Sequence, residues 1–301
     1  MSKRMSETEI RTVQLEMLAY IDKLARENGI EYSLGGGSLL GAIRHQGFIP
    51  WDDDIDIMLD RSNYEKLLIV LKKQENEDYK LLHYSTEKNF LPFAKLYHTG
   101  TEFISKTDKM HPWTGLFIDI FPMDRLPASV EERETFFKFV HSGTENLISS
   151  SFPEYTSGSK LIYSLARLFL RFPRFLRYHG KTREVAEEVD RRMQKYDQDP
   201  VPYIGFTDSR YRLKECFPLE IFSEYEDVAF EQLTARKIKD HQTYLKQLFG
   251  GNYMELPPLS QRRAHSYYTW YWKGKSNEYC CNFCRRRWQP NEIQGQTETI
   301  S

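Results

Sequence analysis

The chain has 301 residues, 40% apolar and 28% charged, a composition typical of a globular protein and one that disfavours disordered and fibrous classes. Its 42 Lys and Arg residues nearly balance 43 Asp and Glu residues, so a net charge of -1 gives no overall field that would attract nucleic acid. No apolar run is long enough to span a membrane, the first residues lack a signal-peptide core, and the four cysteines form no disulfide framework. We therefore expect a cytoplasmic protein that binds no nucleic acid.

Helices and strands alternate in the first part of the chain, and a helical, basic region follows. Residues 115–121 are almost wholly apolar and predict a strand at the centre of a sheet, in which the one acid is Asp119. The predicted elements, in chain order, are helix 7–28, strand 30–34, a helix that begins at Ser38, strand 54–59, helix 63–73, strands 92–98 and 115–121, helices within 130–200, and helix 235–248.

This order predicts an α+β fold in which a mixed β-sheet packs with helices and a helical lobe is inserted. We divide the chain into a catalytic core (1–130), a helical insertion (131–200), a C-terminal part of the same domain (201–265) and a tail with little pattern, compatible with disorder (266–301).

Two aspartates two residues apart on a predicted strand form the main candidate for chemistry. Asp54 and Asp56 project to the same face, while Ile55 and Ile57 point into the core. Adjacent carboxylates repel each other, and a divalent cation such as Mg²⁺ or Mn²⁺ resolves that repulsion. Asp119, alone in its apolar strand, supplies a third carboxylate, and three acids on neighbouring strands fit metal-dependent phosphoryl transfer.

A glycine-rich turn precedes these acids. Gly36 and Gly37 allow backbone N–H groups to approach an anion, and Ser38 can cap the next helix or donate to a phosphate. Taken alone, such a turn is more often only a bend. Its position before the Asp-x-Asp strand makes it much more specific evidence for a phosphate-binding site.

The run LGGGSLLGAIRHQGFIPWDDDIDIMLDRSNYEKL resembles the defining segment of the LicD family of phosphocholine transferases, within the DNA-polymerase-beta-like nucleotidyltransferase superfamily. The resemblance extends to PFAKLYHTGT and FGGNYMELPP, and so covers most of residues 8–265. It implies a nucleotidyltransferase-type sheet, with Gly37, Ser38, Asp54, Asp56 and Asp119 at the matching positions.

The resemblance further implies transfer of phosphocholine, or a related phospho-alcohol, from a CDP-activated donor such as CDP-choline. The acceptor would be a hydroxyl group of a cell-surface polysaccharide or its lipid-linked precursor, and CMP would be released. Two other reactions stay open: nucleotidyl transfer from an NTP to a small hydroxylated molecule, and sugar transfer by an Asp-x-Asp glycosyltransferase.

Several further side chains could serve the site. Arg44 and Lys95 can offset phosphate charge, and Trp51 can stack on a base or face a quaternary ammonium group. The simpler alternatives are a salt-bridged cation and a tryptophan packed on the core. Asp52 and Asp53 are either supporting acids or, the interpretation we favour, loop caps.

Residues 160–181 mix Leu, Phe and Tyr with Arg. This composition fits contact with the inner face of a membrane, a grip on an anionic acceptor, or a helical lobe with a cationic exposed face. Cys281 and Cys284 have the spacing of zinc ligands, but no second pair completes a site.

Overall fold

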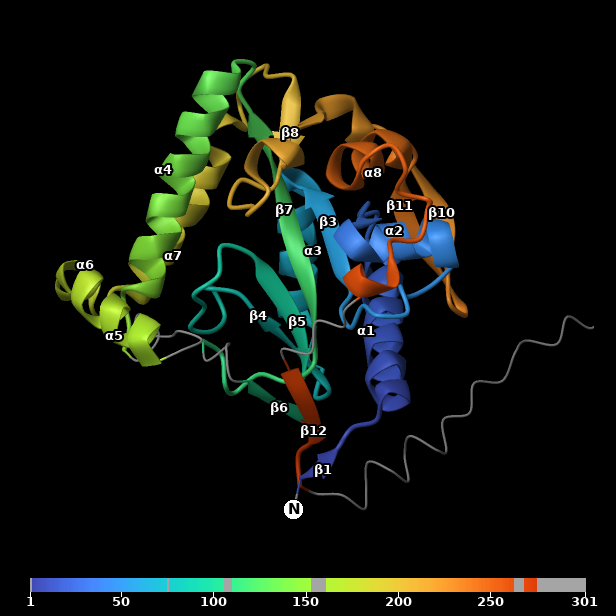
Figure 1. Cartoon of the computed structure of the whole chain (residues 1–301), viewed down its shortest axis with the longest axis horizontal. Helices are drawn as coiled ribbons and strands as arrows, with labels where there is room; N and C mark the ends of the chain where they lie inside the picture. The colour runs from blue at the N-terminus through green and yellow to red at the C-terminus, as the bar shows by residue number, and fades with distance from the viewer. Residues whose placement is uncertain (1, 75, 106–109, 153–160, 263–267, 275–301) are drawn as a thin grey trace, which may run out of the picture.

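The computed structural model describes residues 2–74, 76–105, 110–152, 161–262 and 268–274. The helices of this part are α1 (Glu7–Glu27), α2 (Gly36–His45), α3 (Arg61–Lys73), α4 (Val130–Ile148), α5 (Leu161–Leu170), α6 (Phe172–Tyr178), α7 (Thr182–Met193) and α8 (His241–Phe249) (Figure 1). Its strands are β1 (Lys3–Arg4), β2 (Ser33–Leu34), β3 (Asp56–Asp60), β4 (Tyr79–Leu82), β5 (Ala94–His98), β6 (Thr101–Ser105), β7 (Phe117–Leu126), β8 (Tyr203–Gly205), β9 (Phe217–Pro218), β10 (Tyr225–Phe230), β11 (Leu233–Ile238) and β12 (Tyr268–Trp272).

A mixed sheet forms the centre of the molecule, with the strand order β2-β3-β7-β5-β4. Its β3 and β7 strands run parallel, and the other neighbours in this order are antiparallel. The predicted central position of the 115–121 strand is therefore confirmed, although β7 continues to Leu126 and pairs there with β8. Because β7 is long, it runs from the central sheet toward the helical lobe (Figure 1).

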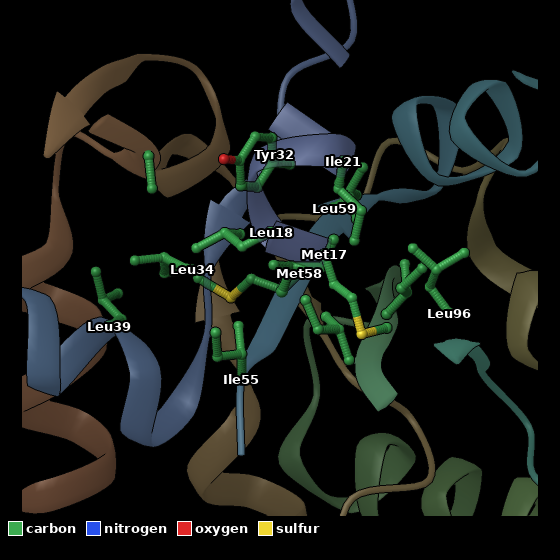
Figure 2. Close-up of a cluster of buried hydrophobic side chains, with 14 of the residues drawn as sticks. Met17, Leu18, Ile21, Tyr32, Leu34, Leu39, Ile55, Met58, Leu59 and Leu96 are labelled. Atoms are coloured by element: carbon green, nitrogen blue, oxygen red, sulfur yellow. The ribbon is translucent and has the colours of Figure 1, made fainter. Parts of the chain in front are cut away.

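Helix α1 covers one face of this sheet. Its start is fixed by a capping box in which the Ser6 hydroxyl accepts from the Glu9 N–H, and the Glu9 side chain accepts from the Ser6 N–H. Side chains of α1 such as Leu18 and Ile21 pack with residues of the sheet, as Figure 2 shows. Ile55 and Ile57 are fully buried, which confirms that the apolar residues between the aspartates point into the core.

The segment predicted as a helical insertion contains α4, α5, α6 and α7. Helices α4 and α7 share a second apolar cluster, formed by residues such as Phe137, Val140 and Val189 together with Leu126 from the end of β7. This cluster places the lobe at the end of the longest strand.

A buried ion network joins the lobe to the sheet. Arg61, at the start of α3, donates from Nε and Nη2 to the two carboxylate oxygens of Asp124 in β7, at 2.6 and 2.8 Å. Its Nη1 donates to Asp190 of α7 at 2.8 Å. Because all three groups are buried or nearly so, removal of one partner would leave an uncompensated charge, which is costly.

Several predicted elements are wrong in their extent, among them the strand predicted over 30–34, which is only β2 (Ser33–Leu34). The helix predicted over 235–248 is a strand up to Ile238, where β11 pairs with β10 in a hairpin, and only then the helix α8. The predicted strand 54–59 begins at Asp56, because Asp56 is the first residue that pairs with β7.

Residues 268–272, within the predicted tail, form β12, which pairs with β1 and β6. Cys281 and Cys284 lie outside the described residues. Among the helices that the structure describes, none has the length and apolar character required to cross a membrane.

Candidate functional site

Asp56 and Asp119 are direct neighbours across β3 and β7. They are paired in the parallel register, and the Asp119 N–H donates to the Ile55 carbonyl at 3.2 Å. Paired residues on adjacent strands project to the same face of a sheet, about 4.8 Å apart. The sheet thus brings together two acids that lie far apart in the sequence.

The run that precedes β3 adds further carboxylates. Ligand atoms of Asp52, Asp53 and Asp54 lie within 4.8 Å of one another, a spacing at which they could share a metal ion. Among the described residues, the predicted trio of Asp54, Asp56 and Asp119 does not form a group with this spacing. The sequence favoured a capping role for Asp52, but the structure places its carboxylate among the other acids. This places Asp52 near the acids but does not test its capping role, and the alternate spacing of Asp52, Asp54 and Asp56 was a signal of this proximity.

These acids raise one another's pKa values. The pKa of Asp54 is raised to about 7 by burial and by the charges of Asp52 and Asp119. The pKa of Asp56 is raised well above its usual value by burial and by Asp54, Asp119 and Asp52. Asp54 as a whole is exposed to solvent, but its carboxylate group is largely surrounded by protein atoms. Burial and mutual repulsion therefore disfavour the charged forms of these acids, a cost that a bound cation would offset, and their hard oxygen donors fit Mg²⁺ or Mn²⁺.

Lys95 is the cation nearest to this cluster. It is paired with Asp119 across β5 and β7, and its Nζ lies 2.6 Å from Asp119 Oδ1 and 3.5 Å from the centre of the Phe117 ring. Its charge opposes the rise in the pKa of Asp54 and Asp56. Lys95 is thus next to the acids, a position from which it could bind a phosphate. In the structure, however, its ammonium group forms an ion pair with Asp119.

The start of α2 lies against the same carboxylates. The predicted turn is part of the helix, which begins at Gly36 and not at Ser38. Ser38 Oγ accepts from the Asp56 N–H at 2.9 Å, which joins α2 to β3. A Cβ atom at Gly36 would lie 3.3 Å from Asp56 Oδ2, and one at Gly37 would lie 2.4 Å from Asp52 Oδ2. Gly36 has a φ of +47°, a conformation that favours glycine, and the absence of a Cβ at Gly37 leaves room for a carboxylate at the first turn, where the helix favours negative charge.

Tyr244 also contacts this turn, although no sequence pattern pointed to it. Its Oη accepts from the Gly36 N–H at 3.0 Å, and its ring stacks on Phe217. Tyr244 comes from α8, more than 200 residues along the chain from Gly36, so only the tertiary structure brings the two together.

Arg44 and Trp51 belong to a second group of side chains, separate from the acids, which also includes His45 and Arg262. Arg44 Nη1 donates to the carbonyls of Tyr253 and Glu255 at 3.0 and 3.2 Å, and its Nε donates to His45 Nε2 at 3.0 Å. The Arg262 guanidinium lies 5.3 Å from the centre of the Trp51 ring.

Burial and the charge of Arg262 lower the pKa of Arg44. Among the described residues, neither arginine has a carboxylate partner at ion-pair distance. We call Arg44, His45, Trp51 and Arg262 the cationic group, and it attracts anions because its two positive charges are uncompensated.

Residues 29–155 match the family model described as LicD/FKTN/FKRP, nucleotidyltransferase domain, a range that includes all the acids above. The lipopolysaccharide cholinephosphotransferase LicD of Haemophilus influenzae is 28% identical over 270 residues, which is 87% of this chain and 97% of the relative. Human ribitol 5-phosphate transferase FKRP is 44% identical over 55 residues, which is 17% of this chain and 11% of the relative. Both named relatives are phosphotransferases.

Proposed function

We propose, from the premise that this chain carries a LicD-family domain, that it is a phosphotransferase which moves a phosphorylated alcohol onto a hydroxyl group of a glycan. The observation that carries the proposal is the register of Asp56 with Asp119, with the start of α2 packed against them. This arrangement offers carboxylate oxygens on one side and helix N–H groups on the other, which are the two environments that a metal-bound phosphate requires.

The finer proposal is that the donor is a CDP-alcohol, with CDP-choline as the first candidate, and that the fold is of the nucleotidyltransferase type. The bond between the bridging oxygen and the phosphorus of the alcohol phosphate would break, and the bridging oxygen would leave with CMP. A new bond would form between the phosphorus of the alcohol phosphate and the acceptor oxygen, whose proton is lost to a base. The likeness to a cholinephosphotransferase over most of both chains supports choline.

Asp54, Asp56 and Asp119, with Asp52 beside them, would hold Mg²⁺ or Mn²⁺. The ion would neutralise phosphate charge and orient the reacting oxygens. Lys95 keeps the Asp119 side chain in place through its ion pair, and Ser38 fixes Asp56 through the backbone hydrogen bond. The N–H groups of Gly37 and Ser38 lie at the helix start, where they can stabilise an oxygen that gains negative charge.

The cationic group would bind the remaining part of the donor. Arg44 and Arg262 supply the positive charge for a phosphate, and Trp51 offers a flat ring for the base or for a quaternary ammonium group. Trp51 directly precedes Asp52, so this group borders the acids along the chain.

The test is to incubate the protein and a glycan acceptor with Mg²⁺ or Mn²⁺ and, in separate reactions, CDP-choline, CDP-ribitol, NTPs and nucleotide sugars. The proposal expects release of CMP together with a phospho-alcohol on the acceptor. Release of pyrophosphate from an NTP would identify nucleotidyl transfer instead, and cleavage of a nucleotide sugar would identify a glycosyltransferase. Turnover that persists after removal of divalent ions would contradict the metal assignment.

A further inference from the structure

Two short helices of the lobe expose large apolar side chains to solvent. In α5, Ile162, Phe169 and Leu170 are 70%, 74% and 79% exposed, and in α6 Leu176 is 65% exposed. No residue of α6 is buried. The two helices lie at the end of the lobe, away from the central sheet (Figure 1). Monomeric proteins rarely leave so much contiguous apolar surface without a binding role.

The same helices carry only positive charge. Residues 161–181 include four arginines and one lysine but no aspartate or glutamate, although the whole chain is close to neutral. Arg174 and Arg177 are both exposed, and Arg174 Nη1 also lies 3.5 Å from Glu145 Oε2. A surface that is both apolar and cationic is complementary to the anionic headgroups and acyl chains of a membrane surface.

The helices are held in this exposed arrangement by an ion pair with the rest of the lobe. Arg171, between α5 and α6, donates from Nη2 to both carboxylate oxygens of Glu145 in α4, at 2.8 and 2.7 Å. Helix α6 packs against α4 and α5. The apolar side chains are therefore presented outward by an anchored pair of helices.

We propose that α5 and α6 form a docking surface for a membrane that contains anionic lipids, with the apolar side chains in the boundary between headgroups and acyl chains. A second copy of this chain fits the surface less well, because a two-fold contact through α5 and α6 would bring cationic residues face to face. Helices of ten and seven residues are too short to span a bilayer, so the contact is interfacial.

The experiment measures co-sedimentation of the full chain with vesicles. Phosphatidylcholine vesicles are compared with vesicles that also contain phosphatidylglycerol, at low and high salt. We expect binding to the anionic vesicles, with weaker binding at high salt because ions screen the attraction.

Three double variants test whether α5 and α6 form the membrane-binding surface. Phe169→Glu with Leu170→Glu should weaken binding more than about tenfold, because both apolar contacts are replaced by charges that the membrane repels. Arg174→Gln with Arg177→Gln should weaken binding to anionic vesicles by about tenfold or more. The matched control is Ile69→Glu with Ile104→Glu, which changes side chains 50% and 63% exposed on other elements and should leave binding unchanged.

Circular dichroism and thermal unfolding check that each variant is folded. The proposal is overturned if the wild-type chain fails to bind anionic vesicles, or if the control variant loses binding as strongly as the α5 variant. It is also overturned if light scattering shows a dimer that the Phe169→Glu and Leu170→Glu changes dissociate. The vesicle assay needs no substrate, so its outcome is independent of the proposed transfer reaction.

Discussion

Asp56 in β3 and Asp119 in β7 are paired in the parallel register, so two carboxylates 63 positions apart in the chain share one face of the sheet. The charge of Asp119 is among the causes that raise the pKa of Asp56. The register thus accounts for part of the repulsion between these acids, which the ion pair of Lys95 with Asp119 opposes.

Asp56→Asn should abolish transfer while the protein stays folded. The substitution removes a proposed metal ligand, and loss of even an outer partner of a metal site commonly costs about 10- to 100-fold. In the metal-free protein the thermal midpoint should rise or stay unchanged, because a repelled carboxylate is removed. CMP release and thermal unfolding measure the two effects, with Asp119→Asn as a parallel variant. Full activity in both variants would refute the assignment of these acids.

Ser38→Ala should lower both stability and activity. The Asp56 N–H loses its acceptor, which costs about 1–3 kcal/mol for a buried donor. The control is Ser33→Ala, because Ser33 Oγ similarly accepts from the buried Ile238 N–H at 3.0 Å but joins β2 to β11. Chemical denaturation should show similar losses of stability, whereas kcat should fall only in Ser38→Ala. Equal kcat values in the two variants would show that Ser38 acts on stability alone.

Arg262→Ala should raise the KM for the donor by about tenfold with little change in kcat, since a charge-assisted hydrogen bond contributes roughly 1.5–3 kcal/mol to binding. Arg262→Lys should restore part of the affinity because it keeps the charge. Arg236→Ala is the control, since Arg236 pairs with Glu31 and Asp227 away from the acids. Steady-state kinetics with varied donor concentration measures the KM of each variant. An unchanged KM in Arg262→Ala would exclude Arg262 from donor binding.

The contribution of two buried histidines to stability should fall as the pH falls from about 6.5 to about 4. Burial lowers the pKa of His83 and of His98 from 6.5 to about 4, so both stay neutral in the fold while the unfolded chain takes up protons. Each histidine then contributes up to about 3 kcal/mol that is present above pH 6.5 and lost toward pH 4.

Denaturant unfolding as a function of pH checks this expectation. In His98→Asn, the asparagine can still accept from the Gly100 N–H, so the fold is kept and the curve should flatten in this range. An identical pH dependence in the wild type and this variant would show that His98 is protonated equally in both states.

Local patterns were sufficient for several elements. The helix predicted over 7–28 is α1, because its apolar spacing lies within the segment and its N-cap, Ser6, directly precedes it. The prediction of a helix over 235–248 was wrong in its first part, which is β11. This strand is stabilised by pairing with β10, and helix propensity takes no account of contacts between strands.

The sequence by itself determined the acidic run, the apolar strand around Asp119 and the glycines before Ser38, because each of these is a local pattern with a physical reason. Only the tertiary structure decided that Lys95 pairs with Asp119, that Tyr244 meets Gly36 and that Arg262 lies over Trp51. These contacts join residues far apart in the chain, and they depend on strand register and helix packing, which the burial of the whole core fixes.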